Sequence, residues 1–333
     1  MENIKEIESI INDYFINEQD TFIYDNYVLF FSIANTVCNI ISNNIANSIV
    51  DDETLINLPS YDIFQRLDFV RDYYSIFNIK DNLKELINNG TIELEGSEYQ
   101  NDDKLSRSYV PITEGFSSKD REDIRVNNTG TIIDSLVLVH ELSHYKNRTP
   151  NERLIAREIL TEPLAFAEKL IMADNIKNHD YEINIELQKQ IITFYNKASY
   201  VIDILVFLLV YKYFGDISFE SYKMVYKKDD YDKRLKWFKE SIKINSLDNL
   251  NILIYYAVAA LISPYLMYRV RENKEFMNKI QNAHEMVKHC KIEEALDYLE
   301  IDYNNINDFS KYLEMFCKEV KEKNNKLSGM KKW

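Results

Sequence analysis

The stretch TGTIIDSLVLVHELSHYKN, Thr129 to Asn147, decides both the fold and the chemistry expected of this chain. It contains His140 and His144, four positions apart, after an apolar run from Leu136 to Val139. Residues i and i+4 of a helix lie on one face, so the two imidazoles can point at one ion. Glu141 lies about 100° round the same helix and need not be a ligand. The stretch therefore predicts a buried helix that carries a metal site.

The residue types at this spacing predict a catalytic zinc site. Imidazole and carboxylate groups bind zinc at about 2.0 to 2.2 Å, and a fourth position stays open for water, whose pKa the metal lowers. Glu141 can accept the proton of that water and pass it to a leaving amine. The alternative is a solvent-exposed histidine pair on an ordinary helix, because the pattern also occurs by chance. His179, His284 and His289 are expected to be ordinary surface residues.

The third metal ligand has to come from another segment. REILTEPLAFAEKLI, Arg157 to Ile171, offers Glu158, Glu162 and Glu168. Proline is tolerated in the first turn of a helix, so Pro163 predicts a helix start or a kink beside Glu162. This favours Glu162 as the ligand, with Glu158 as the second choice. Glu168 is expected to orient a ligand histidine. A solvated helix face is the alternative for each of the three.

Composition and periodicity predict a mainly α-helical protein, with one multi-helical catalytic domain over residues 1–333. Six glycines and five prolines are few for this length, and apolar residues recur at helical spacing. Residues 1–90 predict a helical N-terminal part that includes two helices between residues 3 and 50. Residues 131–325 predict the catalytic helical part, followed by a frayed tail.

The pattern of polar and apolar residues changes between residues 91 and 130, where we expect a small antiparallel β-sheet before the active-site helix. Residues 91–100 and 106–112 alternate in polarity like short strands, and residues 124–130 are a candidate third strand. Residues 115–123 are typical of a loop.

The net charge and the cysteines indicate which partners and which cellular compartment to expect. A net charge of −14 repels phosphate backbones, so no nucleic-acid partner is expected. Cys38, Cys290 and Cys317 are widely spaced, which fits reduced thiols in the cytoplasm, and the acidic N-terminal segment is unlike a signal peptide. Two apolar runs, 201–211 and 252–268, are short for a membrane span, so we expect buried core helices and no membrane association.

The stretch VNNTGTIIDSLVLVHELSHY, Val126 to Tyr145, resembles the active-site segment of the thimet oligopeptidase and oligoendopeptidase F family of zinc peptidases. Members carry a strand with Asn, then Gly-Thr, an Asp, an apolar run and the metal-binding helix. Asn127, Gly130 and Asp134 match this order. The segment LTEPLAFAEKL resembles the family's second helix, which implies Glu162 as the third zinc ligand. The resemblance covers about residue 60 to the end of a chain that is shorter than typical members.

The resemblance also implies residues that stabilise the transition state. LNILIYYAVAALISPYLMYRV resembles the family's late helix, which implies an oxyanion donor among Tyr255, Tyr256 and Tyr265. Packing is the alternative for each tyrosine. The chain departs from the family in having Ser143 where members often have Gly, and in having no histidine shortly before these tyrosines.

Substrate binding is expected at the strand and turn before the metal helix, where a peptide can add to the strand through backbone hydrogen bonds. The expected substrate-binding residues are Val126, Asn127, Asn128 and Gly130. The residues expected to support the ligands are Asp134, Glu158 and Glu168.

These features together predict a metallopeptidase that holds one Zn²⁺ and hydrolyses short peptides, with Glu141 as general base. The alternatives are a narrow processing peptidase for one leader or precursor peptide, a membrane-embedded zinc protease, and a non-catalytic peptide-binding protein. The sequence does not specify the oligomeric state.

Overall fold

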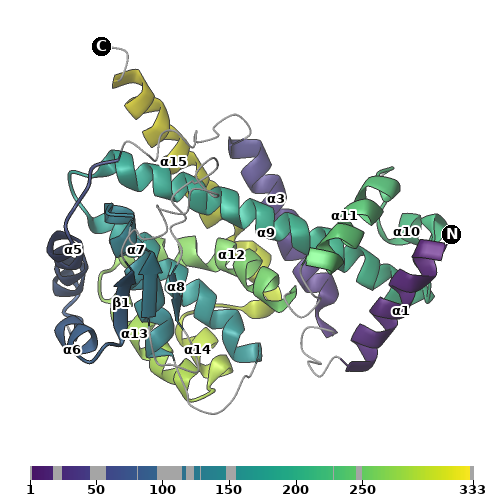
Figure 1. The fold of residues 1–333 in the computed structure, drawn as a ribbon, viewed down its shortest axis with the longest axis horizontal. Coiled ribbons are helices and arrows are strands. Elements are labelled where there is room, and N and C mark those ends of the chain that lie inside the picture. Colours follow the sequence, from purple (N-terminus) through teal and green to yellow (C-terminus); the bar gives the residue numbers. More distant parts are fainter. Residues whose placement is uncertain are drawn as a thin grey trace.

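The computed structural model describes residues 2–17, 25–45, 58–80, 82–95, 115–117, 124–127, 129–147, 155–227, 229–244 and 250–330. The chain is mostly helical over these residues, as predicted. One connected cluster of buried apolar side chains extends from Ile7 to Val320. Figure 1 shows α1, α10 and α11 at one end of the molecule, and α5, α6 and the strands at the other.

The helices before the strands are α1 (Glu2–Asn17), α3 (Tyr27–Ile45), α5 (Ile63–Ile76) and α6 (Leu83–Asn88). Those that follow are α7 (Ile132–Lys146), α8 (Ile155–Asn175), α9 (Asp180–Phe214), α10 (Phe219–Val225), α11 (Tyr231–Ile244), α12 (Leu250–Glu272), α13 (Phe276–Lys288), α14 (Ile292–Tyr298), the 3₁₀ helix η3 (Tyr303–Phe309) and α15 (Ser310–Met330). The tail expected to fray is helical up to Met330, so that expectation is wrong for the described residues.

The described residues do not support the expected small antiparallel sheet, because the strands are very short and one of their two pairings is parallel. The described strands are only three or four residues long: β1 (Ile92–Glu95), β2 (Gly115–Ser117) and β3 (Ile124–Asn127). Their order is β1-β3-β2, and β1 pairs with β3 in the parallel sense, whereas β2 pairs with β3 in the antiparallel sense. The segment expected to be a loop therefore begins with a strand, and residues 106–112 lie outside the described part of the chain.

The metal-motif helix α7 is buried on all sides. Every residue from Ile132 to Ser143 is buried, and α7 packs against α5, α8, α13 and the strands. The side chain of Thr131 accepts a hydrogen bond from the backbone N–H of Ile133 and caps the helix at its start. A helix that is apolar all round belongs in the interior of a protein. The apolar approach to the motif thus carries His140 into the core.

Helix α8 runs along both α7 and α12. Pro163 lies inside α8, eight residues after its first described residue, so the expected helix start at Glu162 is wrong. Proline has no N–H and breaks the hydrogen bonding of a helix interior. The carbonyl of Pro163 accepts a hydrogen bond at 2.9 Å from the hydroxyl of Ser263 in α12. This contact joins α8 to α12 one residue after Glu162.

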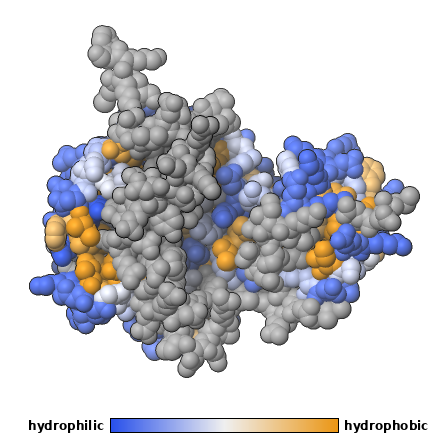
Figure 2. Space-filling model, viewed as in Figure 1, coloured by the Kyte–Doolittle hydropathy of each residue, from blue (hydrophilic) through white to orange (hydrophobic). Residues whose placement is uncertain are grey.

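Two helices are long and apolar enough to cross a membrane, namely α9 and α12. Most of the apolar window of each is buried inside the protein, which is typical of core helices. On the face drawn in Figure 2, the coloured surface is largely hydrophilic, with separate apolar patches towards its two ends.

Candidate metal centre

The turn before α7 is held by Asp134, which lies in the first turn of the helix. Its carboxylate accepts hydrogen bonds from Thr129 Oγ1 at 2.6 Å and from the backbone N–H of Gly130 at 2.9 Å. Nη1 of Arg66 in α5 forms an ion pair with the Asp134 carboxylate at 2.5 Å, and both side chains are buried. Burial raises the pKa of Asp134, and the contacts with Thr129 and Arg66 partly offset that rise. Asp134 therefore holds the turn that leads into α7, and none of these three partners is a candidate metal ligand.

His140, His144 and Glu162 meet at one point, as the sequence predicted. The two imidazole Nε2 atoms lie 3.1 Å apart. Oε2 of Glu162 lies 3.7 Å from Nε2 of His140, and Oε1 lies 3.5 Å from Nε2 of His144. One donor atom from each residue falls within 4.8 Å of the others, so the three could hold a metal ion. The side chain of Glu158, the second choice, lies outside the described part of the structure.

The protonation state of His140 and the unpaired oxygen of Glu162 suit a bound cation. Burial, with the neighbouring His144 and Lys169, holds the pKa of His140 well below its usual value. A neutral imidazole is the form that binds a metal. Oε2 of Glu162 is buried and has no hydrogen-bond partner among the described residues. A buried carboxylate oxygen without a donor is costly unless a cation compensates it.

Glu141 is buried next to His140 on α7. A helical step of about 100° turns its side chain away from the direction that the two histidines share. Glu141 therefore supplies a buried carboxylate that adjoins His140 in the chain and lies off the helix face shared by the two histidines.

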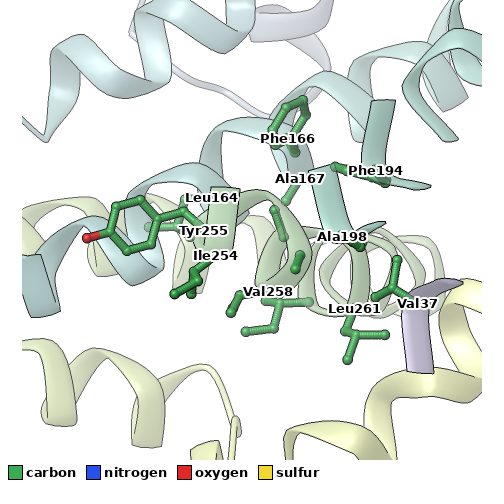
Figure 3. Packing of buried hydrophobic residues seen from close by; sticks show 14 of the residues in the cluster. Val37, Leu164, Phe166, Ala167, Phe194, Ala198, Ile254, Tyr255, Val258 and Leu261 are labelled. Atoms are coloured by element: carbon green, nitrogen blue, oxygen red, sulfur yellow. The ribbon is translucent and has the colours of Figure 1, made fainter. Parts of the chain in front are cut away.

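The three candidate tyrosines of α12 have different surroundings. Phe166 of α8 contacts both His140, with ring centroids 4.4 Å apart, and Tyr256, at 5.2 Å. One aromatic ring, that of Phe166, thus lies in contact with both Tyr256 and the candidate ligand His140. Tyr255 is buried, and Figure 3 shows its hydroxyl pointing away from Phe166. Tyr265 donates its hydroxyl to the carbonyl of Leu299 at 3.1 Å, and burial raises its pKa to about 12.

Glu168 was expected to orient a ligand histidine. Among the described residues, it makes no hydrogen bond or ion pair with His140 or His144. It accepts instead from His284 at 2.6 Å and from Lys146 at 3.0 and 3.1 Å. His284 is buried, so its assignment to the surface is wrong. The sequence held a signal for this, because His284 falls in helical register with the apolar positions of α13, which are Phe276, Met277, Ile280, Ala283 and Val287.

The other two histidines assigned to the surface differ from His284. His289 is exposed, as expected. His179 is only partly exposed, and its Nδ1 lies 3.1 Å from the hydroxyl of Tyr61.

The expected addition of a substrate strand along Val126 is wrong. Val126 is buried and pairs with Leu94 of β1 on one side and with Gly115 of β2 on the other. Strand addition needs a free edge, and β3 lies between two strands. Asn127 pairs with Glu95, and Asn128 lies outside the described residues.

Gly130 has both of its backbone polar groups engaged. Its N–H donates to Asp134, and its carbonyl accepts from the N–H of Tyr61 at 2.7 Å. Its φ of +74° is a conformation that glycine adopts readily. The structure therefore uses Gly130 to turn the chain into α7.

Comparisons of the chain with models of known protein families, with curated proteins and with solved structures found no match.

Proposed function

We propose that the chain is a zinc-dependent metallopeptidase that hydrolyses short peptides, similar in its chemistry to the thimet oligopeptidase and oligoendopeptidase F family. The observation that carries the proposal is the convergence of His140, His144 and Glu162 from two helices. The first two lie one turn apart, whereas Glu162 is distant in the sequence. A cytoplasmic location is part of the proposal, because Cys38, Cys290 and Cys317 are all free thiols.

The spacing of the donor atoms is close to that of the ligands around one zinc ion. Ligands at 2.0 to 2.2 Å in tetrahedral directions lie about 3.3 to 3.6 Å from each other. The two Nε2 atoms lie 3.1 Å apart, Oε1 of Glu162 lies 3.5 Å from His144, and Oε2 lies 3.7 Å from His140, so the separations lie within or about 0.2 Å of this range. Those to Glu162 are long for hydrogen bonds, so hydrogen bonding alone does not account for the arrangement. Two imidazoles and one carboxylate form a common donor set of catalytic zinc sites.

A zinc ion bound there would polarise the scissile carbonyl and lower the pKa of a bound water to about 7. Glu141 accepts the proton of the attacking water, since it is a buried carboxylate that directly follows His140 on α7 and lies off the face that the two histidines share. The same group then donates that proton to the amine that leaves. Burial of Glu141 keeps bulk water from competing for this proton transfer.

Tyr256 is the best placed of the three tyrosines to donate a hydrogen bond to the oxyanion. Its ring packs on Phe166, which in turn packs on His140, and no such contact with Phe166 links Tyr265 to His140 among the described residues. A donor aimed at the oxyanion contributes about 3 kcal/mol to transition-state stabilisation. Tyr265 is unsuited to this role because Leu299 already takes its hydrogen.

Peptide cleavage tests the proposed function directly. The zinc-loaded chain is incubated with a mixed peptide pool, and the products are identified by mass spectrometry. Glu141→Gln removes the base, and Glu285→Gln is a matched control on the exposed surface of α13. We expect cleavage by the wild type and by Glu285→Gln, and loss of cleavage in Glu141→Gln.

The product pattern separates the remaining alternatives. Cleavage of many unrelated short peptides supports the oligopeptidase reading, whereas cleavage of one sequence class indicates a dedicated processing peptidase. Binding of zinc and peptide without any cleavage contradicts the proposal and indicates a peptide-binding protein. Unchanged turnover in Glu141→Gln would reject the assignment of the base.

A further inference from the structure

His284 is a buried histidine that the proposed chemistry does not use. It belongs to α13, and only 2% of its surface is exposed. Its Nδ1 lies 2.7 Å from Oδ1 of Asn147, and its Nε2 lies 2.6 Å from Oε1 of Glu168. Asn147 is the C-terminal cap of α7, and Glu168 belongs to α8. One imidazole therefore joins the two helices that carry the metal ligands.

Lys146, the last residue of α7, makes the same connection directly. Its Nζ lies 3.1 and 3.0 Å from the two oxygens of Glu168, and 3.2 Å from Oε1 of Gln281 in α13. Tyr73 of α5 donates to Glu168 at 3.4 Å. Burial alone would raise the pKa of Glu168, but Lys146 and His284 outweigh it and hold the pKa at about 2. The carboxylate is thus ionised at neutral pH and accepts from all of these donors.

His284, Lys146 and Glu168 form a polar cluster next to the candidate metal centre. Two of its members lie on the same helices as the candidate ligands. Glu168 follows Glu162 by six residues, which is about 9 Å along a straight helix. Lys146 follows His144 by two residues in the last turn of α7. The contacts that hold Glu168 against the end of α7 therefore also set how closely Glu162 approaches His144. A metal site needs its ligands placed to within about 0.2 Å.

We propose that His284 is a positioning residue, which clamps Glu168 to the end of α7 and so sets the distance between Glu162 and His144. This inference rests on the proposed metal centre. Ser143 reinforces it, because its hydroxyl lies 3.4 Å from Nε2 of His284 and its neighbour in the chain is a ligand. Groups that support metal ligands in this way commonly change metal affinity 10- to 100-fold.

The test compares metal binding by variants of the full chain. His284→Leu removes both hydrogen bonds, and His289→Leu makes the same change at an exposed position of the same segment. His284→Gln is the conservative rescue, since its amide can again donate to Glu168. Ile280→Ala loosens the packing of α13 without touching the polar cluster. Zinc affinity is measured by competition with a chelator, and Co²⁺ absorption reports the ligand geometry.

We expect His284→Leu to weaken zinc binding 10- to 100-fold and to shift the Co²⁺ spectrum. His284→Gln should recover part of the affinity, and His289→Leu should match the wild type. Ile280→Ala should lower the melting temperature but leave the spectrum unchanged, which separates positioning from general stability. If His284→Leu does not fold, Glu168→Gln takes its place, because it keeps the volume and removes the charge.

Two outcomes overturn the inference in distinguishable ways. If wild type binds one zinc ion and His284→Leu or Glu168→Gln binds it with the same affinity and spectrum, the cluster does not position the ligands. An equal spectral shift in Ile280→Ala has the same meaning, because general loosening of α13 then explains the effect. If wild type itself binds no metal, the proposed function fails first and takes this inference with it.

Discussion

Nε2 of His140 lies 3.1 Å from Nε2 of His144, and the two oxygens of Glu162 lie at 3.7 and 3.5 Å from these nitrogens. Two imidazole nitrogens that face each other can form a hydrogen bond only if one carries the hydrogen and the other a lone pair. The carboxylate adds negative charge at the same point. A shared cation satisfies all three groups at once, and this is the physical basis of the proposed site.

The first prediction concerns metal content. The wild type should bind one zinc ion per chain, and His144→Ala or Glu162→Ala should lower the affinity at least 100-fold, because each removes a ligand. His289→Ala, at an exposed histidine, is the matched control. Metal analysis after dialysis measures the result, and full zinc content in both ligand variants would contradict the site.

The second prediction separates the tyrosines. Tyr256→Phe should lower kcat about 10²- to 10³-fold with little change in KM, because the hydroxyl would act on the transition state. Tyr265→Phe should keep its kcat and lose about 1 kcal/mol of stability, since its hydroxyl bonds to the carbonyl of Leu299. Steady-state kinetics on one cleaved peptide measure both, and equal kcat values for the two variants would exclude Tyr256 as the donor.

The third prediction concerns Asp134, in the first turn of α7. Asp134→Asn should cost about 3 kcal/mol or more of unfolding free energy, because it removes the negative charge from a buried ion pair with Arg66. Asp68→Asn makes the same change in an exposed ion pair with Arg71 and should cost less than about 1 kcal/mol. Urea unfolding measures both, and similar losses would show that burial does not govern the contribution of Asp134.

The fourth prediction concerns acid stability. The pKa of Glu168 is held at about 2 by Lys146 and His284, against the effect of burial. A carboxylate with a depressed folded pKa stabilises the protein above its unfolded pKa of about 4.3, and this contribution is lost as the pH falls towards 2. The loss amounts to about 3 kcal/mol.

Glu168→Gln checks this dependence, because the amide does not titrate. The free energy of unfolding of this variant should fall less steeply between pH 5 and pH 2 than that of the wild type. Glu285→Gln, at an exposed position, should follow the wild-type curve. Identical slopes for all three proteins would show that Glu168 does not dominate acid unfolding.

The sequence predicted what depends on local spacing. The buried helix with His140 and His144 one turn apart follows from the apolar run and the i, i+4 relation, which need no knowledge of the rest of the chain. The mostly helical fold follows likewise from periodicity and the small number of glycines and prolines. Glu162 was predicted partly by resemblance and partly from Pro163, which was expected to mark a helix start or a kink. Of these two, the helix start is wrong, because Pro163 lies inside α8.

Tertiary structure decided every feature that depends on which helices lie together. Which groups bind the buried His284, whether β3 is an edge strand, and which tyrosine faces Phe166 depend on contacts between distant segments. Local propensity carries no information on these contacts, because burial of a polar group is stable only when a partner from elsewhere in the chain satisfies it. The two histidines are thus a property of one helix, whereas the proposed metal centre exists only where that helix meets α8.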